Sequence, residues 1–295
     1  MTDEGDAAEF MKTNTFARPD LHMHSLYSDG TDTPGSLLRN VRAAGLDIFA
    51  LTDHDTAEGC AAVRRLLGPG DPAFLEGIEF SCRDDRGKYH MLGYCFDAEK
   101  PSIREAVDFA HHSRILKMRN RFVYLQEKFG FTFTEQERAE LMALKNPGKP
   151  HFAAMMLKKG YVQTKDEGFE VFSGYRDTEP SLSPEEAIDA ILRAGGIPVL
   201  AHGILADGSG DLTAQEIGQR VERFKAVGLM GLECYYSTFT LRQKEIMLAL
   251  AERNDLLITA GSDYHGTNKT VALGQTNQPD PARMQRFYQA VADLL

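Results

Sequence analysis

The sequence of 295 residues is poor in cysteine and contains no long apolar run. Its four cysteines are widely spaced and form no Cys-x-x-Cys pair, so we interpret them as reduced thiols that mainly pack in the interior. A helix that spans a bilayer needs roughly 18 consecutive apolar residues, and no segment approaches that length. The acidic start also lacks the core of a signal peptide. We therefore expect a cytoplasmic protein without a membrane partner.

The chain also lacks an excess of basic residues. It has 33 Lys and Arg against 43 Asp and Glu, for a formal charge of -10, which argues against binding duplex nucleic acid through a basic face. Bound divalent ions would reverse this sign locally, so an acidic protein can still bind phosphates at a metal centre. The length and the 42% hydrophobic content predict one large globular domain, or one domain that carries an insertion.

The most informative segment is His22-Met23-His24, which Asp29 follows after a short turn. Two histidines separated by one residue point to the same side of an extended segment, so both imidazoles can bind one ion. A single His-x-His pair is weak evidence, because histidines on strand edges often only form hydrogen bonds. The prediction of a metal site therefore depends on the rest of the chain.

Six further candidate ligands lie in, or just past, short apolar runs typical of buried strands: His54, Glu79, His90, His202, Asp263 and His265. Structural histidines would be scattered along strands and helices. Ligands gathered at the carboxyl ends of parallel strands are instead typical of barrel enzymes. We therefore expect these side chains to form one metal centre with His22, His24 and Asp29.

Strand and helix signals alternate along most of the chain, which predicts an α/β barrel-like fold of about seven strands. The expected strands are 18–22, 47–52, 73–80, 88–95, 197–201, 229–234 and 256–260, and the third and fourth form a hairpin. Between 101 and 181 the alternation gives way to helices over 102–129, after the capping box at Thr134, and over 152–159. We expect a barrel from residues 1–100 and 182–295, a helical insertion domain from 101–181 that covers the active site, and a disordered start.

Several of these segments resemble the motifs of the polymerase and histidinol phosphatase (PHP) family, in the family's order: Asp20-Leu21-His22-Met23-His24-Ser25, Asp53-His54-Asp55, Gly77-Ile78-Glu79, Ala201-His202 and Ser262-Asp263-Tyr264-His265. The resemblance implies a distorted (β/α)7 TIM-like barrel that binds up to three divalent ions and hydrolyses phosphate esters. It also implies the ligands of each ion: His22, His24, Glu79 and Asp263 for one, Glu79, His90 and His202 for another, and Asp29, His54 and His265 for the third. Such mixed ligands suit manganese, iron or zinc and do not choose among them.

The expected mechanism needs no protein nucleophile. A water that bridges two cations loses its proton near neutral pH, so we expect a metal-bridging hydroxide to attack the phosphorus. Asp53 and Asp55 flank His54, and either is a candidate for orienting that ligand or for passing a proton to the leaving group. For Asp55, accepting backbone N–H groups at a helix start is an equally open role.

The insertion is expected to select the substrate. Gly148-Lys149-Pro150-His151 resembles the segment that supplies a cation and a histidine to the remote phosphate in the nucleoside 3′,5′-bisphosphate phosphatase subgroup, which implies that Lys149 and His151 bind substrate. That subgroup usually has arginine where Lys149 stands and proline where Gly203 stands. Arg114, Lys117, Arg119 and Arg121 either meet a second phosphate or form a solvated helix face.

We therefore predict a phosphatase or cyclic phosphodiesterase that acts on a small phosphorylated ribose or nucleotide. Two alternatives stay open: a 5′-3′ exoribonuclease that trims short RNA, and a non-catalytic regulatory module with a vestigial metal site. Against the second, all nine expected ligand positions carry competent side chains. A metal-dependent amidohydrolase usually needs a carboxylated lysine, and no lysine is placed at a strand end to serve. The sequence does not predict the oligomeric state.

Overall fold

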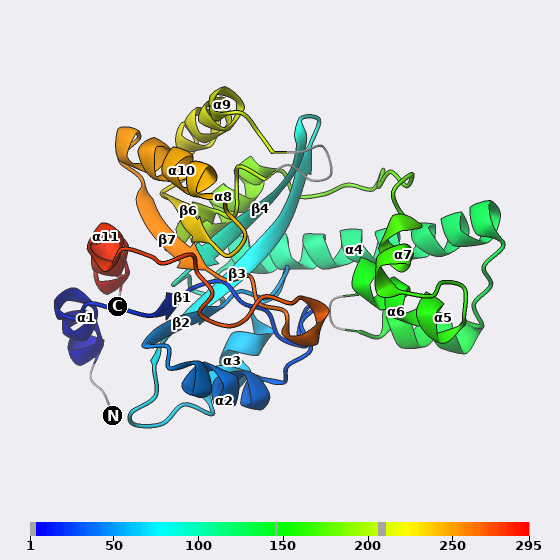
Figure 1. Ribbon diagram of the computed structural model, residues 1–295, viewed down its shortest axis with the longest axis horizontal. Helices are drawn as coiled ribbons and strands as arrows, with labels where there is room; N and C mark the ends of the chain where they lie inside the picture. The colour runs from blue at the N-terminus through cyan, green and yellow to red at the C-terminus, as the bar shows by residue number, and fades with distance from the viewer. Residues whose placement is uncertain (1–3, 145–146, 206–210, 295) are drawn as a thin grey trace.

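The computed structural model describes residues 4–144, 147–205 and 211–294 (Figure 1). Seven strands pair in chain order into one sheet: β1 (Pro19–Asp20), β2 (Ile48–Leu51), β3 (Ala73–Asp84), β4 (Gly87–Tyr94), β5 (Ile197–Leu200), β6 (Gly231–Tyr236) and β7 (Leu257–Gly261). Neighbours pair in parallel, except that β4 is antiparallel to both β3 and β5. The Leu21 N–H donates to the Ala260 carbonyl at 2.8 Å, so the first and last strands meet. This nearly closed, seven-stranded sheet confirms the predicted distorted TIM-like barrel.

The first strand is shorter than predicted, because the chain leaves regular pairing after Asp20. The buried carboxylate of Asp20 accepts the N–H groups of Ser262 and Gly274, at 2.9 and 2.8 Å. Beyond it, a single bridge joins Met23 to Tyr264. A carboxylate thus replaces part of the backbone ladder at the point where the His-x-His segment begins.

Helices cover the outside of the barrel: α2 (Pro34–Ala44), α3 (Glu58–Arg64), α8 (Pro184–Arg193), α9 (Ala214–Lys225), α10 (Leu241–Arg253) and α11 (Pro281–Ala292). Side-chain caps begin all of them except α3. In α2, for example, the Thr33 side chain accepts the Ser36 N–H, and Gly45 ends the helix with a φ of 65°. None of the described helices is long and apolar enough to cross a membrane.

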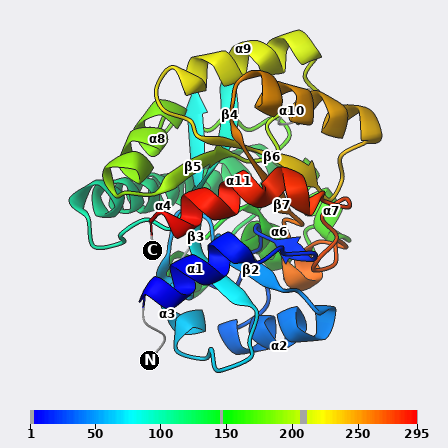
Figure 2. The ribbon, with the colours of Figure 1, turned by 90° about the vertical axis from the view of Figure 1, so that its left-hand side faces the viewer.

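The expectation of a disordered start is wrong for the residues that the structure describes. They form α1 (Glu4–Thr13), which lies beside α11 (Figure 2). Met11 is buried there, and the Phe16 ring lies 4.8 Å from that of Tyr288, centroid to centroid. Two apolar side chains near a partner helix outweigh the acidic composition of this segment.

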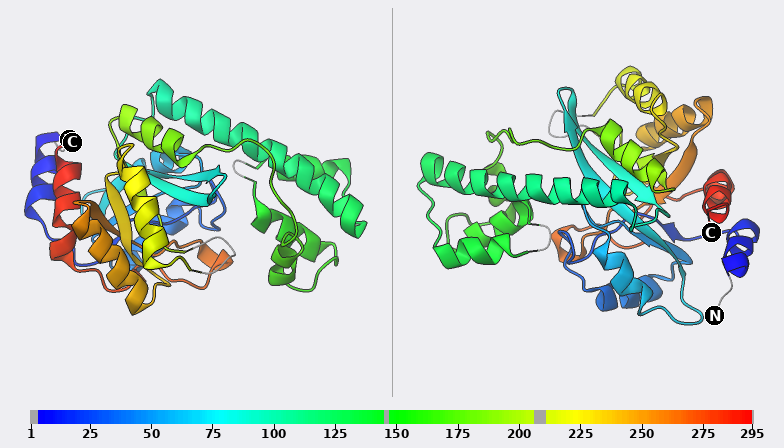
Figure 3. Two further views of the ribbon diagram at one scale, coloured as in Figure 1. Left: turned by 90° about the horizontal axis from the view of Figure 1, so that it is seen from above. Right: turned by 180° about the vertical axis from the view of Figure 1, so that it is seen from behind.

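The segment predicted as an insertion extends away from the barrel in Figure 3. It contains α4 (Pro101–Phe129), α5 (Glu135–Met142), α6 (Lys149–Lys158) and α7 (Lys165–Glu170), the last of which was not predicted. The capping box at Thr134 is confirmed. Helix α6 begins before the predicted position 152, since Pro150 fits the first turn of a helix. The segment has its own apolar cluster: Met118, Phe122, Leu125, Phe133, Leu141, Phe152, Met156, Val162 and Phe172.

Because this cluster is separate, we predict that a substitution in it destabilises the helical segment and leaves the barrel folded. Phe152 is fully buried, with its ring 4.7 Å from that of Phe122. We expect Phe152→Ala to destabilise the segment by about 3–5 kcal/mol, so that hydrogen exchange accelerates in α4 to α7 while the β5–β7 amides stay protected. Phe169→Ala, at a 41% exposed position on α7, is the control. Equal loss of protection in the barrel would contradict a separate core.

Candidate metal centre

Seven of the nine predicted ligands follow the ends of barrel strands, and two lie within strands. His22, His24 and Asp29 follow β1, and His54 follows β2. Glu79 and His90 lie on β3 and β4, whose antiparallel pairing places Glu79 opposite Leu92 and His90 opposite Ser81. The last three ligands, His202, Asp263 and His265, follow β5 and β7. The structure brings all nine side chains together.

Three groups of these side chains have ligand atoms within 4.8 Å of one another. They are His22, His24, Glu79 and Asp263, then His24, Asp29, His54 and His265, and finally His54, Glu79 and His90. In the third group His54 stands where the family resemblance implied His202. The Nε2 atom of His202 nevertheless lies 3.4 Å from a Glu79 oxygen and 3.2 Å from His90 Nδ1. Shared members make the three groups one continuous cluster.

Buried polar atoms in this cluster have no hydrogen-bond partner among the described residues. They are Nε2 of His22 and His24, Oδ1 of Asp29, and both carboxylate oxygens of Glu79. Each such atom costs about 1–3 kcal/mol if it stays unsatisfied. Converging imidazole nitrogens and carboxylate oxygens are the ligands that divalent transition metals prefer. The residues present therefore fit a group of bound divalent ions.

Glu233, which the sequence interpretation missed, orients two of the ligands. It is fully buried on β6, accepts a hydrogen bond from His22 Nδ1 at 3.0 Å and accepts the His202 N–H at 2.8 Å. Proton donation by Nδ1 leaves Nε2 of His22 as the ligand atom, which faces Glu79 and Asp263. The signal in the sequence was a single carboxylate inside the otherwise apolar strand 229–234.

Gly261 allows this close arrangement at the end of β7. A Cβ atom there would lie 2.2 Å from His22 Cβ and 2.4 Å from a Glu233 carboxylate oxygen. Both distances are far below van der Waals contact, and the neighbours belong to the cluster itself. Only glycine fits between a ligand and the carboxylate that orients it.

The two aspartates predicted to be catalytic are held by protein groups. One Asp53 oxygen accepts from the Ser25 N–H and the Ser28 hydroxyl, at 2.7 and 2.6 Å, and the other accepts from the Ser25 hydroxyl at 2.7 Å. Asp53 therefore fixes the loop that carries His24. Asp55 accepts the Ser81 N–H at 2.8 Å and pairs with Arg114 of α4. These contacts favour positioning over proton transfer for both carboxylates.

Two further side chains contact Asp263. Lys269 Nζ and the Tyr236 hydroxyl lie 2.5 and 2.7 Å from its Oδ2 atom. Its Oδ1 atom faces His22, His24 and His265. Although burial raises the pKa of Asp263, His22 and Lys269 hold that pKa well below its ordinary value. The carboxylate is therefore ionised and ready to bind a cation.

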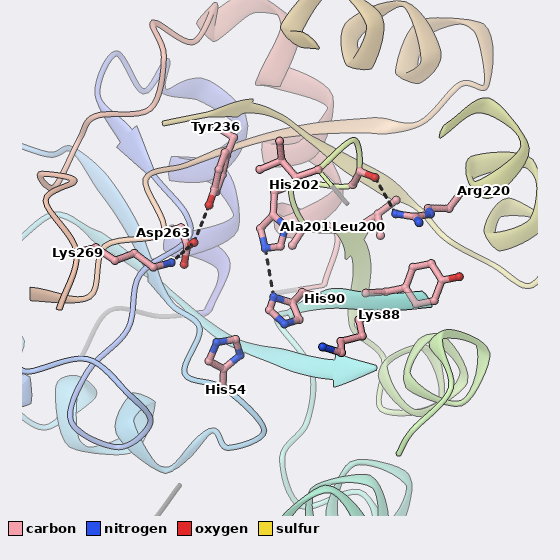
Figure 4. A pocket seen from close by; sticks show the side chains of 13 residues that line it. His54, Lys88, His90, Leu200, Ala201, His202, Arg220, Tyr236, Asp263 and Lys269 are labelled. Carbon is pink, nitrogen blue, oxygen red and sulfur yellow. Dashed lines mark hydrogen bonds and ion pairs between the residues drawn. The ribbon is translucent and has the colours of Figure 1, made fainter. Parts of the chain in front are cut away.

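Two cavities meet at His54, Lys88 and His90. The first, of about 310 Å³, extends past His202 and Tyr236 to Arg220 of α9, and we call it the Arg220 cavity (Figure 4). The second, of about 240 Å³, lies between the barrel and the helical segment, and we call it the insertion cavity. Its lining includes Arg83, Arg114, Lys117, Arg121 and Lys149. Both cavities adjoin the cluster on the side where His90, with a 33% exposed side chain, is most accessible.

The two predicted substrate-binding residues lie in the first turn of α6. Lys149 lines the insertion cavity with Gly148 and Pro150. His151 is not among the described lining residues, and its Nδ1 atom accepts the Gly148 N–H at 3.1 Å. Burial lowers the pKa of His151, so its ring is neutral near pH 7. His151 thus shapes the start of α6, and Lys149 is the nearer of the two to a ligand in this cavity.

Known proteins share this fold and these segments. The PHP domain model matches residues 20–177, which is more than half of the chain. A protein of Bifidobacterium adolescentis, assigned as a metal-dependent phosphoesterase, has a solved structure that superposes with a TM-score of 0.80 at 28% identity, covering 93% of this chain and 98% of its own.

Three curated relatives cover most of the chain. A 3′,5′-nucleoside bisphosphate phosphatase of Chromobacterium violaceum is 27% identical, over 84% of this chain and 87% of its own. A phosphoribosyl 1,2-cyclic phosphate 1,2-diphosphodiesterase of Eggerthella lenta is 29% identical, over 84% and 94%. A 5′-3′ exoribonuclease of Haemophilus influenzae is 26% identical, over 87% and 93%.

The fold, the cluster and these likenesses define a metal-dependent phosphoesterase. The chain belongs to the PHP family. The predicted family and hydrolase class are thus confirmed.

The position of Glu233 generates a prediction for metal affinity. We expect Glu233→Gln to weaken binding of Mn²⁺ or Zn²⁺ by about 10- to 100-fold, because the amide no longer makes His22 a stronger base. Calorimetric titration of the metal-free protein measures this change. Glu222→Gln, at an exposed position on α9, should leave the affinity unchanged. Equal affinities for the wild type and Glu233→Gln would exclude the orienting role.

Proposed function

We propose that the protein hydrolyses small phosphate esters of a phosphorylated ribose or nucleotide at a centre of two to three manganese, iron or zinc ions. The observation that carries this proposal is the convergence of buried imidazole nitrogens and carboxylate oxygens beside a cavity lined by cations. The residues 101–181 serve in this proposal as a domain that reads the substrate, and the residues 1–100 and 182–295 as the metal-binding barrel.

The nine candidate ligands would hold the ions. When bound, the ions would supply an activated water and would neutralise charge on the phosphoryl oxygens. Glu79 would be shared between ions, since both of its oxygens face imidazoles. Asp53 and Glu233 would act by holding ligands in place, as their hydrogen bonds indicate. Lys269 brings a positive charge to the same edge of the centre.

The cations that line the insertion cavity are the reason for proposing that the substrate carries a second phosphate. Lys117 lines it, is partly buried, and donates to the neutral Ser181 hydroxyl at 2.8 Å, with no carboxylate partner among the described residues. Burial and the neighbouring Arg114 lower the pKa of Lys117 to about 8, which still leaves the amine mostly charged at pH 7. A buried cation with a neutral partner is suited to binding an anion. Lys149 enters the same cavity from α6.

Loss of the metal ligands should abolish hydrolysis. We expect chelation, His22→Ala or Asp263→Ala to lower turnover of any phosphate ester by about 1,000-fold or more, because charge stabilisation worth several kcal/mol is lost. Phosphate release in the presence of manganese measures the effect. His111→Ala, at an exposed position on α4, is the matched control. Undiminished activity of the metal-free protein would exclude the proposed function.

Loss of the insertion cations should affect only substrates with two phosphates. We expect Lys117→Gln and Lys149→Gln each to lower kcat/KM for a nucleoside 3′,5′-bisphosphate by roughly 10- to 100-fold, as for a lost charge-assisted hydrogen bond. The kcat/KM for a nucleoside 3′-monophosphate should change less than about twofold. Arg119→Gln, on the exposed face of α4, is the control. The Lys117 effect should also fade as the pH rises through about 8, where the wild-type amine loses its charge.

The ratio of kcat/KM for the bisphosphate to kcat/KM for the monophosphate tests whether the insertion cavity binds the second phosphate. If both lysine variants keep the wild-type ratio of kcat/KM values, the insertion cavity does not bind the second phosphate, although the metal centre still hydrolyses the ester.

A further inference from the structure

One arginine at the end of the Arg220 cavity has no carboxylate partner among the residues that the structure describes. Figure 4 shows Arg220 at the end away from Asp263 and Lys269, with His202 and His90 between them. Its Nη1 atom donates to the Gly203 carbonyl at 2.9 Å, and its guanidinium lies 4.5 Å from the centroid of the Tyr89 ring. No ion pair joins Arg220 to any residue in the described part of the chain.

Two carboxylates whose charges act on this guanidinium, Asp84 and Glu216, accept hydrogen bonds from other groups. Asp84 accepts hydrogen bonds from Arg223 at 2.5 Å and from the Tyr89 hydroxyl at 3.0 Å. Glu216 closes the capping box of α9 and accepts both the N–H and the hydroxyl of Thr213. These bonds engage both oxygens of Asp84 and the Oε2 atom of Glu216. The positive charge of the half-buried arginine is therefore left for an external anion.

The placement of this charge relative to the metal centre indicates which anion it binds. The Arg220 cavity and the insertion cavity meet at His54 and His90, so a phosphorus bound at the centre has one cavity on each side. A phosphomonoester carries one substituent and would fill only one of them. The volume of about 310 Å³ lies within the range of small-molecule sites, roughly 300–1,000 Å³.

We propose that the Arg220 cavity binds a second, phosphate-bearing substituent of the reacting phosphorus, so that Arg220 makes the protein prefer phosphodiesters that carry an anion beyond the scissile bond over those that do not. This proposal rests on the proposed function. In the step, the oxygen of water bonds to phosphorus, and one P–O ester bond breaks. The electron pair of that bond leaves with the alkoxide, which takes up a proton, so no other reactant is required.

A pair of substrates that differ only in one terminal phosphate tests the proposal in the unaltered protein. Both are 5′-phosphorylated diadenylates, and only one of them carries a terminal 3′-phosphate. We expect kcat/KM to be about tenfold or more higher for the substrate with the terminal phosphate, as for a charge-assisted hydrogen bond in a partly buried site. Equal values for the pair would overturn the proposal.

Variants of the arginine assign the preference to it. Arg220→Gln should reduce the preference to less than about twofold, Arg220→Lys should keep part of it, and both should hydrolyse adenosine 3′,5′-bisphosphate at the wild-type rate. Arg253→Gln, at an exposed position on α10, should change nothing. An equal loss on all three substrates would show that Arg220 only supports Tyr89 and Gly203, and would overturn the proposal.

Binding separates this proposal from the proposed function. Analogues of the two diadenylates in which methylene groups replace both bridging ester oxygens of the scissile linkage cannot be cleaved. Calorimetry measures the dissociation constants of these analogues. An Arg220-dependent preference for the analogue with the terminal phosphate, with no hydrolysis of any ester, would support the binding site and contradict the proposed function. Hydrolysis of the bisphosphate, with equal binding of both analogues, would do the reverse.

Discussion

The structure depends on one buried carboxylate surrounded by imidazoles. The Glu79 oxygens lie 2.9–3.4 Å from nitrogen atoms of His22, His24, His54, His90 and His202. Such crowding around a buried carboxylate is unfavourable unless cations or protons fill the space between the ligand atoms. Burial opposes the charge on Glu79, yet the nearby imidazoles hold its pKa well below the ordinary value. The strands bring the imidazoles to Glu79, Gly261 leaves room for His22, and Glu233 orients the His22 ring.

The antiparallel strand β4 also contributes a ligand to this cluster. In a barrel of parallel strands alone, every ligand would come from a strand end. Because β4 runs against β3 and β5, His90 reaches the cluster from within a strand and pairs across it with Ser81. Ser81 in turn donates its N–H to Asp55, which holds Arg114 of α4. The distortion of the barrel thus connects the metal centre to the helical segment through a few hydrogen bonds.

Much of this could be predicted from the sequence, since apolar runs followed by histidines or carboxylates mark strand ends wherever they occur along the chain. The nine candidate ligands were accessible to that reasoning, as were the β3–β4 hairpin and the capping box at Thr134. Glu233 was not, because its partner His22 is 211 positions away and local pattern carries no information about that contact. Arg220 could not be predicted for a different reason. Its availability to an anion depends on hydrogen bonds that engage Asp84 and Glu216, and these are seen only in the structure. The start of the chain was misjudged, since its order depends on α11.

Helix α4 has a mechanical consequence for ligand binding. It runs for 29 residues without an internal glycine or proline. Near one end Ser102 donates to the Ala190 carbonyl of α8 beside the barrel, and near the other Phe122 lies in the separate apolar cluster. A continuous helix of this length is a stiff rod that crosses from one core to the other. The residues of α4 that line the insertion cavity are therefore held in place before a ligand binds. Binding then costs less conformational entropy, because folding has already ordered these residues.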